Sequence, residues 1–263
     1  ATRKLGDLAV GEIVKLKEYS VSVNYIIVNQ GKPSSAYDNS CDGTWLLRQD
    51  CVDRHPWYDF GSDWPENTLE TSDIQPWLNS TMLSKYDSKT QSWIKQVKIP
   101  YRKGGGEDGV DQTGSNGLSC KVFLLSAIEV GRDYDNYKRP NDGALLDYFI
   151  VGNTTAANKQ RIAKSNGQDY LWWLRSPTIS STTQVYTVQA DGSVSGELAK
   201  YDYGVRPAVV LPSTLYVTDD GSLTDNTPPS VPTSITIPET IRGGEDTSII
   251  WSAATDPDGN LDG

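Results

Sequence analysis

Two arginines stand in the two most strand-like segments of an acidic chain, and their guanidinium groups are the first candidates for chemistry. Arg175 lies in "YLWWLRSP" (170–177) and Arg206 in "YGVRPAVVLP" (203–212). A guanidinium among apolar residues needs acceptors, because leaving it buried and unpaired costs several kcal/mol. It would therefore either recognise an anionic sugar or a carboxylate, or form a buried ion pair that fixes strand register.

We favour the ion pair, because arginine is seldom buried without a partner. The candidate partners are the carboxylates of Glu129, Asp169 and Asp202. We accordingly predict a structural framework made of Trp172, Trp173, Arg175, Arg206 and Glu129.

Groups suited to catalysis are scarce. A hydrolase needs a base that a third group positions, and the single imidazole, His55 in "DRHPWYD", stands beside a proline and is expected in a loop. A carboxylate pair for glycoside hydrolysis stays open, since the chain has 34 acidic residues, but no spacing singles out two of them. We predict no catalytic residue, no enzyme activity and no cofactor.

Metal ligands and disulfides are equally weak signals. The cysteines are Cys41, Cys51 and Cys120, an odd number without a CxxC motif, so neither a zinc site nor a disulfide framework is indicated. Their spacing leaves a bond between Cys41 and Cys51 open. The acidic stretches "RPND" (139–142) and "DPDGNLDG" (256–263) are better explained as turns than as calcium loops. We predict no metal site.

Alternating and capping patterns predict the elements that must position these residues in the first half of the chain. Residues 12–33 alternate like a β-hairpin, and residues 43–52 form a further strand. Short helices are predicted over 71–83, where Ser72 and Gln75 form a capping box, and over 87–99, with Trp93, Ile94 and Val97 on one face. Residues 104–117 are a polar loop.

The second half is rich in strands. Residues 120–131 predict a strand that runs into a short helix capped by Ser126. Asp191-Gly192, between alternating segments, is a strong hairpin signal, and a short antiparallel meander extends to residue 212.

Composition limits the class of protein and suggests two domains. The 263 residues carry a net charge of −10, which argues against a nucleic-acid partner, and their apolar runs are far shorter than the ~20 residues that cross a bilayer. After residue 216 the chain turns rich in Asp, Thr, Ser and Pro, so residues 217–232 are predicted to be a linker. Residues 233–263, with Trp251 as a core residue, resemble the first strands of an immunoglobulin-like or fibronectin type III module, a partial β-sandwich.

The two arginine motifs, with "VYTVQADGSV" between them and "VFLLSAIEVG" before them, are similar to a domain family of bacteriophages and prophages. That family resembles the C-type-lectin-like superfamily, which includes the phage major tropism determinant and the formylglycine-generating enzymes. The resemblance covers roughly residues 5–215, within a predicted domain of residues 1–216. It implies an α+β fold of the C-type-lectin type, with a twisted antiparallel sheet, two or more short helices and long loops. The chain has no cysteine after Cys120, which disfavours the enzymatic branch.

In such relatives the ligand surface lies on the loops that join the two arginine strands. Here that surface would be residues 178–184, the outward side chains Tyr186 and Val188, and residues 196–203. Tyrosine rings stack on sugars and hydroxyl or amide neighbours bond them, although the same tyrosines could instead shield the sheet edge. The candidate ligand-binding residues are Ser180, Thr182, Gln184, Tyr186, Tyr201, Asp202 and Tyr203.

We therefore expect a non-catalytic protein of the virion surface, in a head or tail fibre or as a decoration protein. It would bind a host-cell-surface glycan or protein through these loops, and other virion proteins or a second copy of the chain are further candidate partners. No membrane insertion is expected. The alternatives are a purely structural capsid-decoration or fibre-assembly domain, and an adhesin on a bacterial cell surface.

Overall fold

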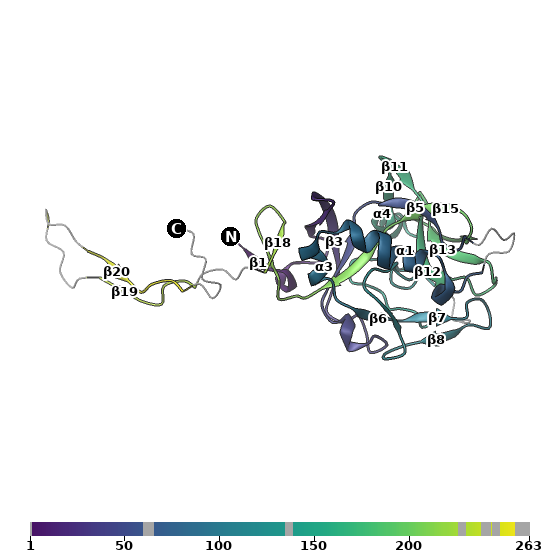
Figure 1. Ribbon diagram of the computed structural model, residues 1–263, viewed down its shortest axis with the longest axis horizontal. Helices are drawn as coiled ribbons and strands as arrows, with labels where there is room; N and C mark the ends of the chain where they lie inside the picture. The colour runs from purple at the N-terminus through teal and green to yellow at the C-terminus, as the bar shows by residue number, and fades with distance from the viewer. Residues whose placement is uncertain are drawn as a thin grey trace.

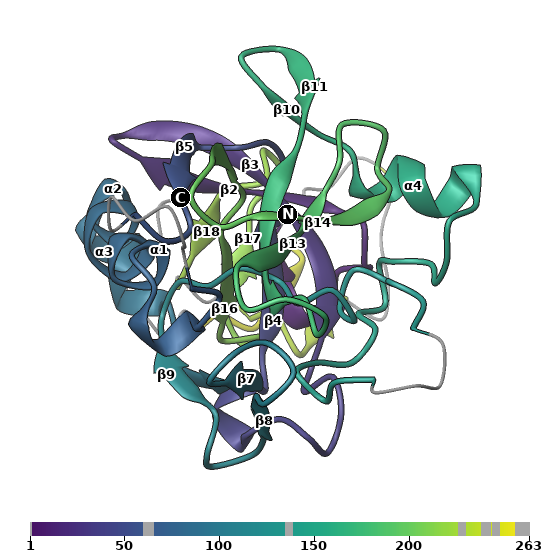
Figure 2. The ribbon, with the colours of Figure 1, turned by 90° about the vertical axis from the view of Figure 1, so that its right-hand side faces the viewer.

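Strands dominate the structure. The computed structural model of the chain describes residues 2–59, 66–134, 139–225, 230–237, 243 and 248–255. Strands make up 35% of it and helices 15%, and the strands form several small sheets (Figure 1 and Figure 2). The predicted α+β fold of the C-type-lectin type is therefore wrong, because the segments expected to form helices are broken by turns and strands.

The larger sheet is built on β12 (Trp172–Pro177), which carries the first arginine motif. Its strand order is β14 (Val194–Leu198), β13 (Gln184–Val188), β12, β15 (Asp202–Val205) and β5 (Asp53–Pro56). The predicted meander is correct from β12 to β14, where Gly192, with a φ of 86°, occupies the predicted hairpin turn. β15 departs from the meander, because it crosses to the other side of β12 and pairs with it in parallel.

The second sheet has four strands and begins with the predicted N-terminal hairpin. Its order is β16 (Ala208–Leu211), β4 (Thr44–Arg48), β3 (Val21–Gln30) and β2 (Ile13–Glu18). β2 and β3 pair antiparallel and turn at Tyr19 and Ser20, whose φ angles are 48° and 66°, so the hairpin is confirmed. β16 follows Arg206 directly, which places the second arginine motif where the chain passes from one sheet to the other.

The helices are short and interrupted. A 3-10 turn (Leu69–Thr71) leads to α1 (Ile74–Trp77), a π-helical turn (Leu78–Met82) and α2 (Leu83–Lys85). Ser72 Oγ accepts a hydrogen bond from the Gln75 N–H at 3.3 Å, as its capping pattern predicts. α3 (Ser88–Trp93) ends before Val97, which enters β6 (Val97–Ile99), so the prediction of a helix over 87–99 is wrong. No helix among the described residues is long and apolar enough to cross a membrane.

Two further predictions are corrected between residues 100 and 131. The predicted loop over 104–117 contains β8 (Val110–Gln112), which pairs with β7 (Tyr101–Lys103). β9 (Leu118–Cys120) pairs with β6, and residues 121–131 then form turns rather than a strand and a helix. These turns are held by neighbouring segments, since the Asn79 side chain bonds the backbone of residues 121 and 122.

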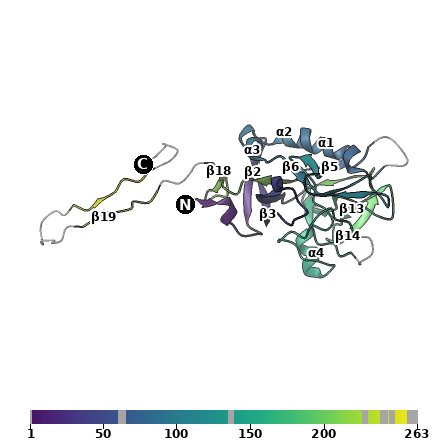
Figure 3. The same cartoon turned by 90° about the horizontal axis from the view of Figure 1, so that it is seen from below.

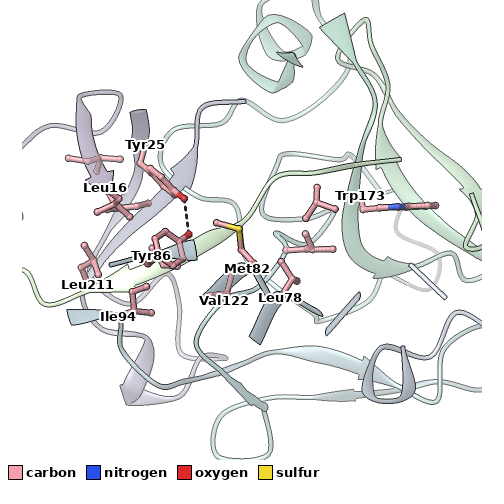
Figure 4. Packing of buried hydrophobic residues seen from close by; sticks show 14 of the residues in the cluster. Leu16, Tyr25, Leu78, Met82, Tyr86, Ile94, Val122, Trp173 and Leu211 are labelled. Carbon is pink, nitrogen blue, oxygen red and sulfur yellow. Dashed lines mark hydrogen bonds between the residues drawn. The ribbon is translucent and has the colours of Figure 1, made fainter. Parts of the chain in front are cut away.

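The inner strands of both larger sheets are covered on both faces by two hydrophobic clusters. One cluster contains Trp173 and Val185 and extends to the N-terminal hairpin. Figure 4 shows it running from Trp173 past Met82 to Tyr86 and Tyr25, whose hydroxyl groups are hydrogen-bonded at 2.7 Å. The other cluster contains Trp172 and Tyr186 on the opposite face. The near-continuous apolar run of β12 thus reflects a strand that is covered from both sides.

Small sheets complete the fold, and the chain leaves it at the end where it entered. α4 (Thr155–Arg161) precedes the hairpin of β10 (Ala163–Ser165) and β11 (Gln168–Tyr170). β17 (Tyr216–Val217) pairs with both β1 (Arg3–Lys4) and β18 (Leu223–Thr224). Figure 3 shows β18 at this end and β13 and β14 at the other.

Beyond that end, the structure describes one two-stranded element. β19 (Ile235–Thr236) pairs with β20 (Ile250–Trp251), and Trp251 is 62% exposed, since the described part offers no second layer to cover it. β17 and β18 occupy the start of the predicted linker. The immunoglobulin-like assignment of residues 233–263 stays a prediction, and "DPDGNLDG" lies outside the described residues.

Candidate functional site

Arg175 is enclosed by acceptors. It lies where the register between β12 and β13 shifts, and its side chain is 1% exposed. Nη1 and Nη2 donate to Oε2 and Oε1 of Glu129 at 2.6 and 2.7 Å, so one of the acceptors that the sequence suggested meets this arginine. The remaining donor directions are filled by the carbonyl oxygens of Pro100, Leu124 and Asp142 at 2.7–3.0 Å. All five N–H groups of the guanidinium are therefore bonded.

The Glu129 carboxylate extends this network to other segments. It accepts hydrogen bonds from the Tyr37 hydroxyl at 2.6 Å and from the Ser126 N–H at 2.8 Å. Nearby, the Ser176 hydroxyl donates to Asp142, whose pKa burial raises to about 6. Burial likewise raises the pKa of Tyr37 well above its usual value. The network joins five separate stretches of chain and leaves the guanidinium no free donor for a ligand.

The paired tryptophans of the same strand are fully buried. Trp172 Nε1 donates to the Arg161 carbonyl oxygen at 3.0 Å, and Trp173 Nε1 donates to the His55 carbonyl oxygen at 2.9 Å. Each ring belongs to a different hydrophobic cluster. "YLWWLRSP" is thus the central strand of the larger sheet, where the side chains of successive residues pack on opposite faces.

Arg206 is as deeply buried as Arg175 but bonded far less. Its Nε donates to the Arg48 carbonyl oxygen at 2.7 Å, and its guanidinium carbon lies 4.9 Å from the centre of the Trp172 ring. Its Nη1 has no hydrogen-bond partner among the described residues. None of the three suggested carboxylates meets it: Glu129 pairs with Arg175, Asp169 pairs with Lys164, and Asp202 is exposed. Burial lowers its pKa to about 10.

The loop over residues 178–184, predicted to contact a ligand, is held in place by hydrogen bonds from Asn67. The Asn67 side chain donates to the carbonyl oxygens of Ser181 and Gln184 at 2.7 and 2.8 Å, and its N–H donates to the Thr182 carbonyl oxygen at 2.9 Å. Of the predicted loop residues, Ser180 and Thr182 are exposed and Gln184 is half-buried. The loop is therefore well anchored, and the hydroxyl-bearing side chains of Ser180 and Thr182 are exposed on it.

Tyr186 and Val188 do not face outward, and that prediction is wrong. Both side chains are buried in the second cluster. The Arg132 guanidinium lies 4.3 Å from the centre of the Tyr186 ring, and Tyr134 contacts the same ring edge-on at 6.0 Å. The reason is that β13 is an interior strand whose outer face is covered by the segment around residues 132–134, so neither of its faces meets solvent.

Tyr201 and Tyr203 do form a surface, as part of a row of three rings, here called the stack, whose neighbouring planes are tilted by 43° and 47°. Tyr203 lies 5.1 Å from Trp173 and 5.5 Å from Tyr201, measured between ring centres. Tyr201 is 41% exposed, while burial raises the pKa of Tyr203 to about 12. The stack therefore runs from a ring in the core to a ring in solvent, and a buried tryptophan holds the outer rings in place.

Two further aromatic side chains border this stack. His55 is directly opposite Tyr203 in the β5–β15 ladder, so both side chains lie on one face of the sheet. The His55 ring is 5.1 Å from Trp77, and His55 therefore belongs to a strand rather than to the predicted loop. We call Tyr201, Tyr203, His55 and Trp77 the aromatic face. The sequence did not indicate His55 or Trp77, because only the pairing of β5 with β15 brings them to the tyrosines.

The polar group bonded to the aromatic face is acidic. The Tyr203 hydroxyl donates to Glu197 at 3.5 Å, whereas the exposed Asp202 precedes Tyr203 in β15 and therefore points to the opposite face of the sheet. Carboxylates accept hydrogen bonds from hydroxyl groups and repel anions. The face thus combines apolar rings with acceptors suited to an uncharged polyhydroxyl ligand.

Thiols and acidic residues form no other centre in the described part of the chain. Cys41, Cys51 and Cys120 are free thiols, so Cys41 and Cys51 are not joined, and burial raises the pKa of each. No group of three His, Cys, Asp or Glu side chains among the described residues is arranged to hold a metal ion.

Residues 42–213 match the family described as "Domain of unknown function (DUF6273)". The matched region contains both arginine motifs, the aromatic face and Asn67, whereas β1 to β3 lie before it. No curated protein and no solved structure matches the chain. Because the match spans more than half of its length, the chain belongs to the DUF6273 family.

Proposed function

We propose that this member of the DUF6273 family is a non-catalytic recognition protein that binds a neutral host-cell-surface glycan through the aromatic face. The observation that carries the proposal is the stack from buried Trp173 through Tyr203 to exposed Tyr201. A ring held by a packed neighbour offers its face to the apolar side of a sugar with little loss of side-chain freedom.

The surroundings support a neutral sugar rather than an acidic one. Glu197 provides acceptors for sugar hydroxyl groups, and its negative charge disfavours a carboxylate at the same place. We further propose that the protein acts at the surface of a bacteriophage virion, on the ground that its arginine motifs are similar to those of phage surface domains.

Glycan binding by the full chain tests this function. The wild-type chain is applied to an array of neutral and acidic glycans, and the affinity of each bound glycan is then measured by titration calorimetry. We expect neutral glycans to bind and Tyr201→Ala to weaken them by about tenfold, the equivalent of ~1.4 kcal/mol.

Tyr19→Ala is the matched control, since Tyr19 is a more exposed tyrosine in the β2–β3 turn. It should leave binding unchanged. The proposal fails if no glycan binds the wild-type chain, or if Tyr201→Ala and Tyr19→Ala bind as tightly as it does. Ordered incorporation into a capsid by a chain that binds no glycan would favour the structural alternative.

A further inference from the structure

A second concave site lies around Arg206. A pocket of about 350 Å3 lies between the turn after β4, the region from α4 to β10, and β3. Arg206 lines it together with Lys159, Lys164, Gln49 and Gln160. Its volume falls within the range of pockets that hold small molecules. None of these residues belongs to the aromatic face.

The hydrogen bonds of Arg206 are incomplete in a way that those of the other buried arginines are not. The fully buried Arg161 donates to the carbonyl oxygens of Gly192, Val130 and Gly152 and to the Asn158 side chain. Arg175 uses all its donors, as described above. Arg206 makes one hydrogen bond, and its buried Nη1 has no partner among the described residues. Buried charged donors are expected to be paired, so this group marks a place for an acceptor that the described residues do not supply.

The charges around the pocket favour an anion. Three cationic side chains, those of Arg206, Lys159 and Lys164, face one carboxylate, Asp50. One Asp50 oxygen already accepts the Lys164 N–H at 2.9 Å, and the Lys164 ammonium pairs with Asp169 at the surface. This basic pocket belongs to a chain with a net charge of −10, so its sign is a local property.

The remaining lining narrows the chemical class. Ile26 and Ile162 give the pocket apolar walls, and the amides of Gln49 and Gln160 stand beside them. An apolar wall with amide groups suits a small molecule that carries both a hydrocarbon skeleton and hydroxyl groups. Asp50 disfavours a doubly charged group such as phosphate, because like charges repel strongly at a partly buried site.

We propose that the Arg206 pocket binds a small carboxylate-bearing ligand of the acidic-sugar class, with the carboxylate on the guanidinium group of Arg206. The guanidinium, fixed against Trp172 and the Arg48 carbonyl oxygen, forms the floor of the site. Lys159 supplies attraction at the rim, and the glutamine amides bond the hydroxyl groups. This site is independent of the neutral-glycan function proposed for the aromatic face.

Titration calorimetry on the full chain tests the proposal, with glucuronate as the probe and glucose and inorganic phosphate as comparisons at constant ionic strength. We expect glucuronate to bind, glucose not to bind, and phosphate to bind at least tenfold more weakly. Arg206→Gln should abolish glucuronate binding. Lys159→Ala and Gln49→Ala, which change exposed side chains and keep the fold, should each weaken it several-fold.

Each other outcome overturns the inference. Equal binding of phosphate and glucuronate contradicts the carboxylate class. Binding that survives both Lys159→Ala and Gln49→Ala places the ligand elsewhere, and the absence of glucuronate binding by the wild-type chain refutes the site. Tyr201→Ala, which tests the aromatic face, should leave glucuronate binding unchanged, so the two proposals fail separately.

Discussion

Arg175 and Arg206 have similar sequence surroundings, but they differ in how many hydrogen bonds their guanidinium groups form. Each follows apolar strand residues, and each side chain is 1% exposed. Arg175 has two ion-pair contacts and three carbonyl acceptors, whereas Arg206 has a single carbonyl acceptor and an aromatic ring. The guanidinium of Arg175 is fully hydrogen-bonded and has a structural role. The guanidinium of Arg206 has an unused donor, and this residue lines a pocket.

The difference shows that burial alone does not assign a role to a charged residue. What distinguishes the two arginines is whether the fold supplies acceptors in enough directions. Glu129 reaches Arg175 from 46 residues away, through a turn that Ser126 caps. No carboxylate among the described residues reaches Arg206 in the same way.

The largest expected effect on stability comes from breaking the buried ion pair of Arg175 with Glu129. Glu129→Ala leaves Arg175 buried with its two strongest acceptors removed, and loss of one partner of a buried pair costs about 3–5 kcal/mol. Chemical denaturation should show this decrease in the free energy of unfolding. A decrease below about 1 kcal/mol would mean that water or movement compensates, and the contrast between the two arginines would lose its basis.

The hydrogen-bond network around Arg175 includes Asp142, whose titration should make the stability of the protein depend on pH. Its pKa rises from 3.8 to about 6 on folding, so the folded state binds more protons between these values. The stabilisation is complete below pH ~4 and is lost as pH rises through 6, a total of about 3 kcal/mol.

Asp142→Asn removes this titration while keeping an oxygen to accept the Ser176 hydroxyl. The difference in unfolding free energy between variant and wild type should be near zero at pH 4 and should favour the variant at pH 8. A difference that is constant with pH would contradict the assignment.

A smaller effect is expected at the open arginine. Arg206→Met keeps an apolar stem against Trp172 and removes a charge whose Nη1 has no partner, so it should cost about 1–2 kcal/mol, mainly through the unpaired Arg48 carbonyl oxygen. Thermal and chemical denaturation should place it well below Glu129→Ala. A loss as large as that of Glu129→Ala would mean that the two arginines are equally structural.

The smallest effect on stability is expected for an exposed ion pair, which serves as a reference for the buried one. Asp169→Ala breaks an ion pair with Lys164 in which both side chains are about half exposed. Solvent screens such a pair, so we expect a change of about 0–1 kcal/mol by chemical denaturation. A loss of several kcal/mol would show that ion pairs in this protein gain their strength from something other than burial.

Local patterns predicted the elements that local chemistry controls. Alternation predicted the β2–β3 hairpin, the Asp191-Gly192 pair predicted the β13–β14 turn, and the Ser72 capping pattern predicted a hydrogen bond that forms. These features depend on residues only a few positions apart, and their physics is contained in the segment itself.

Features that depend on distant segments were not predictable in this way. The parallel pairing of β12 with β15 and the placement of β5 beside it follow from packing of the whole sheet. For this reason Tyr186 proved to be covered, and His55 joined the aromatic face. The unpaired Nη1 of Arg206 could likewise not be predicted, because the sequence shows which acceptors exist but not which of them lie close to the guanidinium in the fold.

The ladder of β1, β17 and β18 also determines how the domain bears a mechanical load. A pull transmitted along the chain from residue 225 acts first on the exposed ion pair of Asp225 with Lys89. It then acts on the contact of Gly221 with Lys15 and on the two-residue pairings of β18 with β17 and of β17 with β1. These short ladders can peel apart one after the other and lengthen the connection before tension reaches the buried β16. The fold therefore carries an extensible element where the chain leaves it, at the end of the molecule opposite β13 and β14 (Figure 3).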